Sequence, residues 1–280
     1  MPPYPSCRVR ALVHVPLIYF TPLQDTHSFI RIVHLFKADF SCNILLIQNV
    51  LFGFVFWGNL FYMPIYLENV RGYSPTIAGA IIMPMVGTQG IGSIVSGLII
   101  SRTGHYNHVM IAAQFLWAAG LVAQAFYSAT TPIWAICLVG FFQGLGTGCC
   151  FQPSLVAILA HSRRADRAVL NSLRNFLRTM GGTLGLTVSG SILNNVLQSR
   201  LKDVVSEGIA EQLASSTHSL ESLGLNEVQK AAVLDAYMHG IRIIFIVYAP
   251  LIGVCALGAL LVKDTGLAEK DTSTTLQVAK

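Results

Sequence analysis

Charged side chains are scarce in this sequence. Asp, Glu, Lys and Arg make up 11% of its 280 residues, whereas 53% are hydrophobic. A soluble domain carries about 25% charged residues, so the ordinary soluble class is excluded. The deficit is concentrated in long apolar runs, which is the pattern of a membrane protein. The formal net charge of +5 comes from basic residues that flank these runs, so it does not indicate a nucleic-acid partner.

Sequence patterns for enzymatic or metal chemistry are also missing. There is no glycine-rich phosphate loop with a lysine, no metal-binding His-Glu spacing and no nucleophile elbow. The cysteines lack the spacing of a zinc site or a disulfide framework, and most of them lie inside apolar runs as small hydrophobes. We therefore predict no enzymatic activity, no metal and no cofactor.

Six segments are apolar over about 20 residues, the length that crosses a bilayer as a helix. They cover residues 43–67, 76–100, 108–127, 132–159, 168–197 and 241–262. We predict an all-α membrane protein in which these six transmembrane helices form one bundle in the lipid bilayer. Its organisation is then a cytoplasmic or atypical N-terminal segment at 1–42, a transmembrane domain at 43–262 and a cytoplasmic tail at 263–280.

The connections between the spans predict their orientation. Arg102 lies between the second and third spans, and the connection at 161–167 carries three arginines. The connection at 128–131 has no charge, and the long connection at 198–240 is acidic. Basic loops stay in the cytoplasm, so we expect both termini there and the 198–240 loop outside the cell.

The long loop at 198–240 is expected to contain two short amphipathic helices. The first covers about residues 203–214. The second begins at Asn226, where Gln229 completes a capping-box pattern, and continues to Tyr237. The polar tail at 263–280 is expected to be disordered.

The first span carries a stripe of aromatic and amide side chains. At 100° per residue, one sector of the helix holds Asn49, Phe52, Phe56, Asn59 and Met63. One interpretation is a cavity wall that binds a bulky, mostly apolar solute. The other is a helix–helix packing face with amide hydrogen bonds. The sequence leaves both open.

Arg174 and Arg178, inside the fifth span, are the clearest candidates for chemistry. Arg178 lies about 15 Å along this helix from Ala168. A charge at that depth faces a cavity, pairs with another group or extends back to the surface. Either the arginines are structural, or they bind an anionic group or take part in proton coupling. Their helix face also holds Asn171, Gly182, Gly185 and Ser189.

The fourth span combines a glycine series with polar residues. Gly140, Gly144 and Gly148 recur every four residues, which predicts tight helix packing. Gln143 is a candidate for contact with a solute, and Pro153 is expected to kink the helix. No span has Asp or Glu at its centre, so a coupling carboxylate is expected outside this chain.

The connection after the second span resembles a known family motif. The residues Gly97-Leu-Ile-Ile-Ser-Arg-Thr-Gly104 are similar to the cytoplasmic loop motif of the major facilitator superfamily. Arg102 and Gly104 match its arginine and glycine. The resemblance implies that Gly97, Arg102 and Gly104 form a loop that latches the carrier during its conformational change.

Residues 35–264 resemble the fungal branch of 14-spanner drug:proton antiporters more specifically. The matching segments are Leu51-Phe-Gly-Phe-Val-Phe-Trp-Gly-Asn-Leu-Phe-Tyr-Met-Pro-Ile-Tyr66, Arg71-Gly-Tyr-Ser-Pro75, Gly144-Leu-Gly-Thr-Gly148, Gln152-Pro153, Asp166-Arg-Ala-Val169, Arg174-Asn-Phe-Leu-Arg178, Gly181-Gly182, Asn194-Asn195 and Tyr237-Met-His-Gly-Ile-Arg-Ile-Ile-Phe245. The resemblance implies the C-terminal half of a secondary transporter in the plasma membrane, with proton-coupled efflux of amphipathic drugs, toxins or metabolites.

A carrier of this branch is about twice as long, because two halves rock around a site between them. The sequence is therefore expected to be a fragment whose partners are the lipid bilayer, an amphipathic solute, protons, and a missing N-terminal half or a second copy. The alternative is a truncated half-carrier that does not transport and is inert or binds a partner.

Overall fold

The computed structural model describes residues 40–162, 166–202 and 227–262. All of them belong to one compact unit, Asp39–Lys280. The predictions for the N-terminal segment, for a helix at 203–214 and for the tail lie outside the described residues.

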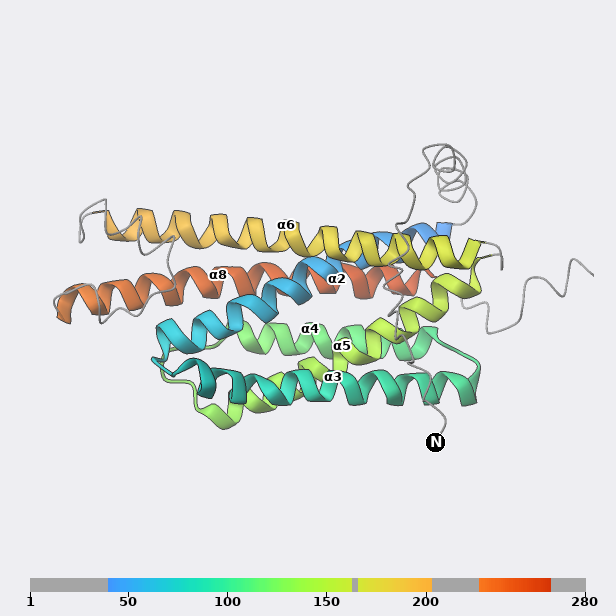
Figure 1. The fold of residues 1–280 in the computed structure, drawn as a ribbon, viewed down its shortest axis with the longest axis horizontal. Helices are drawn as coiled ribbons and strands as arrows, with labels where there is room; N and C mark the ends of the chain where they lie inside the picture. The colour runs from blue at the N-terminus through green and yellow to red at the C-terminus, as the bar shows by residue number, and fades with distance from the viewer. Residues whose placement is uncertain (1–39, 163–165, 203–226, 263–280) are drawn as a thin grey trace, which may run out of the picture. The chain divides into compact units, whose positions relative to one another are not determined.

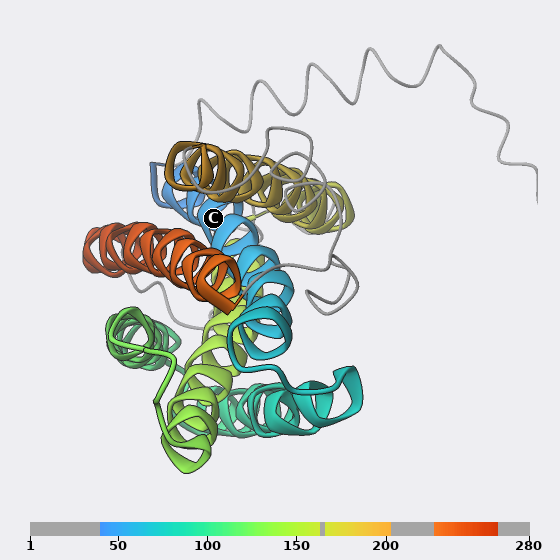
Figure 2. The same ribbon diagram turned by 90° about the vertical axis from the view of Figure 1, so that its left-hand side faces the viewer.

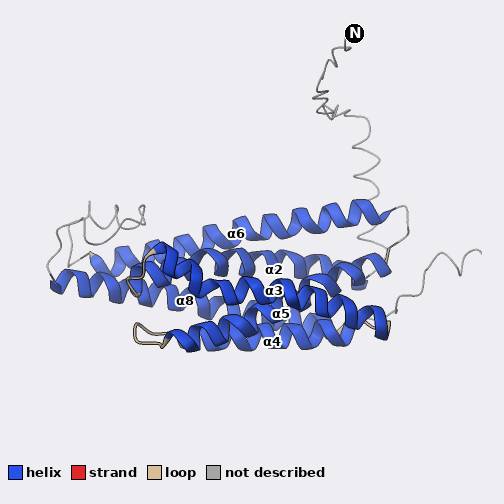
Figure 3. Ribbon diagram, turned by 60° about the horizontal axis from the view of Figure 1, so that its bottom comes forward, coloured by secondary structure: helices blue, strands red, loops and turns tan. Residues whose placement is uncertain are grey.

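The described part of the chain is helical (Figure 1, Figure 3). Its elements are α2 (Phe40–Ile65), the π-helical turn η1 (Tyr66–Val70), α3 (Pro75–Thr103), α4 (Asn107–Ala125), α5 (Ile133–Ala160), α6 (Arg167–Leu201) and α8 (Glu227–Leu260). The six long helices confirm the all-α class. The first helix changes to η1 just after Pro64, whose missing N–H interrupts the α-helical hydrogen-bond series.

Five of these helices are long and apolar enough to cross a membrane: α2 with η1, α3, α4, α5 and α8. The predicted span at 168–197 lies in α6, which is long enough but less apolar, because its first half carries arginines and its second half mixes Gly, Thr, Ser and Asn with apolar residues. A membrane helix of this composition needs protein neighbours or water along part of its surface.

The helices form two groups, α3 with α5 and α4, and α2 with α6 and α8, and the packing of α4 on α8 is the main contact that joins them. α3 packs mainly on α5, and α2 packs mainly on α6. α4 lies against both α5 and α8, while α8 also contacts α6 and α2. Seen from the helix ends, α2 lies between the α6–α8 pair and α5 (Figure 2). Side chains of α2 therefore reach every part of the unit.

Close backbone contacts hold the two main helix pairs together. On α5, a Cβ atom added to Gly144 would lie 2.1 Å from the Met85 carbonyl oxygen of α3. A Cβ atom added to Gly148 would lie 2.2 Å from the Gln89 carbonyl oxygen of α3. The predicted tight packing of these two glycines is thus confirmed. On α6, a Cβ atom at Gly181 would lie 2.0 Å from the Val50 carbonyl oxygen of α2. Only glycine permits backbones to approach so closely.

The helix boundaries differ from the sequence prediction beyond α6. α8 begins at Glu227, in agreement with the helix predicted from Asn226, but it does not end near Tyr237 and continues into the sixth span as one helix of 34 residues. At 1.5 Å per residue it is about 51 Å long, more than the roughly 30 Å of a bilayer core. The flanking segment extends the helix because no proline interrupts it and its apolar residues pack on α6. The buried seam includes Leu197, Leu201, Val233, Ala236 and Tyr237.

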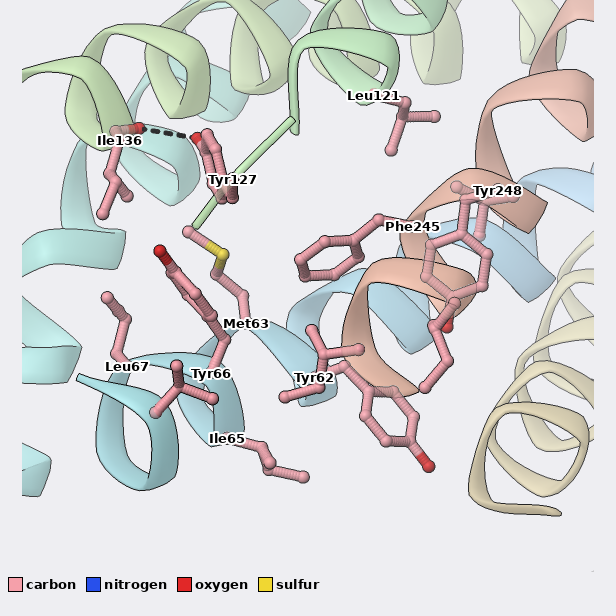
Figure 4. Packing of buried hydrophobic residues seen from close by; sticks show 14 of the residues in the cluster. Tyr62, Met63, Ile65, Tyr66, Leu67, Leu121, Tyr127, Ile136, Phe245 and Tyr248 are labelled. Carbon is pink, nitrogen blue, oxygen red and sulfur yellow. Dashed lines mark hydrogen bonds between the residues drawn. The ribbon is translucent and has the colours of Figure 1, made fainter. Parts of the chain in front are cut away.

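An aromatic cluster fixes the turn between α4 and α5 (Figure 4). Tyr66 and Tyr127 stack with their ring centroids 5.7 Å apart, and Phe245 of α8 meets Tyr127 edge-on. The Tyr66 hydroxyl donates to the Ser128 carbonyl oxygen at 2.7 Å. The short turn is thereby tied to η1 and α8, which holds this end of the helices in place.

Candidate functional site

The residues predicted to contact a solute divide into two groups along α2. Phe52 and Phe56 lie with the two arginines of α6 around Phe151 of α5, whereas Asn59 and Gln143 belong to a separate hydrogen-bonded group. The predicted stripe therefore has different neighbours at its two ends.

Phe151 is the centre of the first group. Its ring centroid lies 5.2 Å from that of Phe56, 6.4 Å from that of Phe52 and 6.2 Å from that of Trp117 on α4. Phe52 and Trp117 are fully buried. The cluster thus joins α2, α4 and α5, and its α6 side is occupied by arginines rather than by further apolar residues.

Arg174 and Arg178 lie one turn apart on α6 and both contact Phe151. Arg174 Nη2 donates to the Phe151 carbonyl oxygen at 3.3 Å. The Arg178 guanidinium carbon lies 4.8 Å from the centroid of the Phe151 ring, a cation–π distance. Arg178 Nη2 also makes a long, 3.4 Å bond to Asn175 Oδ1. The prediction that these two arginines share one face of the helix agrees with this geometry.

The charge of this region is not balanced by carboxylates. Helices α2, α3, α4, α5 and α6 as described contain no Asp or Glu, and Glu68 lies in η1 after the first helix. Arg174 is 95% buried, and its Nε has no hydrogen-bond partner among the described residues. Since an unpaired charge is costly in an apolar interior, two cations here are an unusual feature.

Three amides form a closed ring of hydrogen bonds between α2, α4 and α5. Asn59 Nδ2 donates to Gln143 Oε1 at 2.9 Å, Gln143 Nε2 to Gln124 Oε1 at 2.7 Å, and Gln124 Nε2 to Asn59 Oδ1 at 2.7 Å. All three side chains are at least 98% buried. For Asn59 and Gln143 this geometry favours the packing interpretation, because the amides satisfy one another.

Asn49 lies apart from both groups. Its Nδ2 donates to the Leu45 carbonyl oxygen one turn earlier on the same helix, at 2.7 Å. Its Oδ1 is buried without a partner among the described residues. Asn49 is thus buried in the unit, and its contacts join it to neither the arginines nor the amide ring.

The predicted loop motif ends α3. Gly104 has φ +72°, and its N–H bonds the Ile100 carbonyl oxygen as a left-handed cap, which explains the need for glycine. Arg102 is exposed. A Cβ atom added to Gly97 would lie 3.9 Å from the Gln152 side chain of α5. The geometry explains Gly104, while the latching role of the motif stays a prediction.

Sequence reasoning missed Phe151, Trp117 and Gln124. Gln124 carried a usable signal, because an amide inside a predicted span is a candidate by default. Phe151 and Trp117 had none, since an aromatic residue in an apolar run does not reveal its neighbours. In the described ranges, no three His, Cys, Asp or Glu side chains are grouped to hold a metal ion.

Comparison with known proteins places these helices in a family. Residues 45–199 match the model of the Major Facilitator Superfamily. The chain is 38% identical over 232 residues to "Citrate exporter 1" of Yarrowia lipolytica, covering 82% of this chain and 34% of that protein. It is 32% identical over 229 residues to "MFS-type transporter clz4" of Cochliobolus lunatus, covering 81% of this chain and 40% of the relative.

A solved structure shows the same fold. A bacterial homologue of the human lysosomal transporter Spinster, inward-facing and occupied, superimposes with a TM-score of 0.64 at 16% identity, over 81% of this chain and 50% of that one. The chain spans between about a third and two fifths of the length of the two curated relatives. It is therefore a multi-pass integral membrane protein that belongs to the Major Facilitator Superfamily, and its helices have the fold of one half of such a transporter.

Proposed function

We propose that this chain forms one half of a secondary exporter for small amphipathic solutes, driven by proton antiport. One of its relatives is named an exporter. Two halves of such carriers rock around a site at their interface, so a second half completes the pathway. The coupling proton requires a titratable group. Helices α2, α3, α4, α5 and α6 hold no carboxylate, and Glu68 in η1 and Asp235 in the first part of α8 lie toward the ends of their spans, so we place that group in the other half.

One observation carries this proposal: a row of hydroxyls on the exposed face of α6. Thr179, Thr183, Thr187 and Ser191 follow at four-residue intervals, all exposed. Each hydroxyl donates to a carbonyl oxygen of its own helix at 2.8–3.0 Å. This bonding satisfies the donors but leaves a polar surface. Such a face suits a water-filled pathway or the other half better than lipid chains.

The exposed surfaces of neighbouring helices differ in character. Those of α3 and α8 carry large apolar side chains, among them Met83, Ile94, Val254 and Leu257. Faces of this kind are suited to lipid or to another apolar helix. α6 also exposes Phe176, Met180, Leu184 and Val188, so its surface differs from those of α3 and α8 by the hydroxyl row and not by a lack of apolar side chains. This row, together with the half-buried Arg178, supports assigning that part of α6 to the translocation pathway.

The orientation and location also belong to this proposal. The α3–α4 and α5–α6 connections lie at the same end of the helices, where Arg102 is in the last turn of α3 and Arg167 is the first residue of α6. We place this end in the cytoplasm, with both termini, and the protein in the plasma membrane.

The test starts from the size of the natural product. An antibody against residues 263–280, used on membranes of the source organism, measures the length of the protein that contains this chain. Efflux of preloaded amphipathic compounds is then compared between cells that express this product and cells that lack it, with and without a proton uncoupler. We expect uncoupler-sensitive efflux; a membrane-inserted product without efflux would instead support the non-transporting half-carrier.

A further inference from the structure

We propose that the exported solute is an organic anion, and that Arg178 contacts its acidic group while the apolar body lies on Phe56 and Trp57. This inference rests on the proposed export function and names its substrate class. It starts from Arg174 and Arg178 of α6, whose contacts among the described residues include no carboxylate.

The two arginines are not equivalent. Arg174 is 95% buried and anchored to the α5 backbone. Arg178 is half-buried, and its contacts are the Phe151 ring face and one long bond to Asn175. A guanidinium has five N–H donors. The contacts of Arg178 with described residues leave most of its donors for a ligand, so Arg178 is the contact group and Arg174 the positioning residue.

The backbone at Arg178 is held rigidly. A Cβ atom at Gly53 of α2 would lie 1.8 Å from the Arg178 carbonyl oxygen, so the two helices touch at this residue. Gly185 makes a similar approach to Phe54 two turns further along α6. A fixed Cα position limits where the guanidinium can move, and such preorganisation favours binding of a ligand with a defined charge.

Aromatic surface lies against α6 one turn beyond Arg178. A Cβ atom at Gly182 would lie 2.4 Å from the Trp57 ring, which places this indole against α6 just beyond Arg178. Trp57 is 43% exposed and lies 5.6 Å from the half-buried Phe56, measured between ring centroids. A cation beside exposed aromatic rings matches a ligand with an acidic group on an apolar body. A cationic drug would be repelled by the two arginines.

Three probes that differ only at one end test the charge preference. Pyrenebutyrate, pyrenebutanol and pyrenebutylamine are titrated at neutral pH against the full natural product in nanodiscs of phosphatidylcholine, with empty nanodiscs subtracted. Quenching of tryptophan fluorescence reports binding. We expect the carboxylate to bind at least about tenfold more tightly than the alcohol, and the amine to bind most weakly. Equal affinities of the carboxylate and the alcohol would overturn the inference.

Variants assign the preference to one side chain. Arg178→Gln is expected to reduce the carboxylate-to-alcohol ratio to below about threefold, and Arg178→Lys to retain an intermediate ratio because it keeps the charge. The matched control is Arg200→Gln on the same helix. Arg200 pairs with Asp235 at 2.9 Å on the exposed surface. The carboxylate-to-alcohol ratio of this control should equal that of the wild type. An unchanged ratio in a folded Arg178→Gln protein contradicts the assignment.

Two further readouts separate the competing explanations. If anionic phosphatidylglycerol in the nanodiscs displaces pyrenebutyrate completely, a lipid headgroup occupies Arg178 and the solute assignment is wrong.

Efflux of the same compounds distinguishes this inference from the proposed function. Export of all three compounds at equal rates would support the proposed export function and contradict the anion preference. Selective binding of pyrenebutyrate without efflux would support the anion site and contradict the proposed export function.

Discussion

Gly181→Ala is expected to destabilise the protein by about 1–3 kcal/mol, the typical effect of overpacking a closely packed interior. The added Cβ atom would lie 2.0 Å from the Val50 carbonyl oxygen and 2.8 Å from its carbon. Both atoms belong to the backbone of α2, so no side-chain rotation can relieve the overlap. α2 and α6 must separate, and this contact also positions Arg178. Unfolding of the purified natural product by dodecyl sulfate in mixed micelles measures the change.

The matched control is Gly253→Ala on α8. An added Cβ atom at Gly253 meets no atom within 4 Å, although this position is also inside a long helix. Because alanine has the higher helix propensity, we expect the control to be neutral or slightly stabilising. Equal destabilisation of the two variants would show that the α2–α6 contact is looser than the structure indicates.

Gln143→Leu is expected to destabilise the protein by about 1–3 kcal/mol, because it leaves buried polar groups without partners. It removes the acceptor of Asn59 Nδ2 and the donor to Gln124 Oε1, in a ring that joins three helices. Hydrogen bonds between membrane helices contribute on average only about 0.6 kcal/mol, so the loss arises mainly from the two groups left unpaired. The same unfolding assay applies.

Two further variants make this prediction specific. The triple variant Asn59→Leu, Gln124→Leu and Gln143→Leu removes all three amides, so no ring amide is left buried without a partner. Its free energy of unfolding should therefore be closer to that of the wild type than that of Gln143→Leu alone. Gln152→Leu is the matched control, because this half-buried amide on the same helix makes no side-chain hydrogen bond to another described residue. A triple variant with the summed loss of three single variants would show that the ring acts as independent bonds.

Local sequence signals were sufficient for most of the helices. Apolar length placed α2, α3, α4 and α5 to within a few residues, since a bilayer sets the length of a spanning helix. They also predicted a helix from Asn226 to Tyr237, which lies in α8, but they separated it from the sixth span expected at 241–262. Polar residues there suggested a boundary, but the helix continues because Val233, Ala236 and Tyr237 pack on α6. Such packing depends on a neighbour that is distant in sequence.

The candidate site was predictable only in part. Periodicity placed Arg174 and Arg178 on one helix face, and it correctly grouped Phe52 with Phe56. It also placed Asn59 in that stripe, although the structure pairs Asn59 with amides of α4 and α5. A helical period specifies the direction of a side chain but not which neighbour it meets.

The sequence by itself determined the membrane class, the positions of the spans and the family, because these depend on apolar length, charge distribution and local motifs. Tertiary structure alone decided which polar groups are satisfied. It closed three amides from three helices into a ring and left two arginines beside one phenylalanine without a carboxylate. The physical reason is that the cost of a buried polar group depends on its partners, and those partners come from other helices.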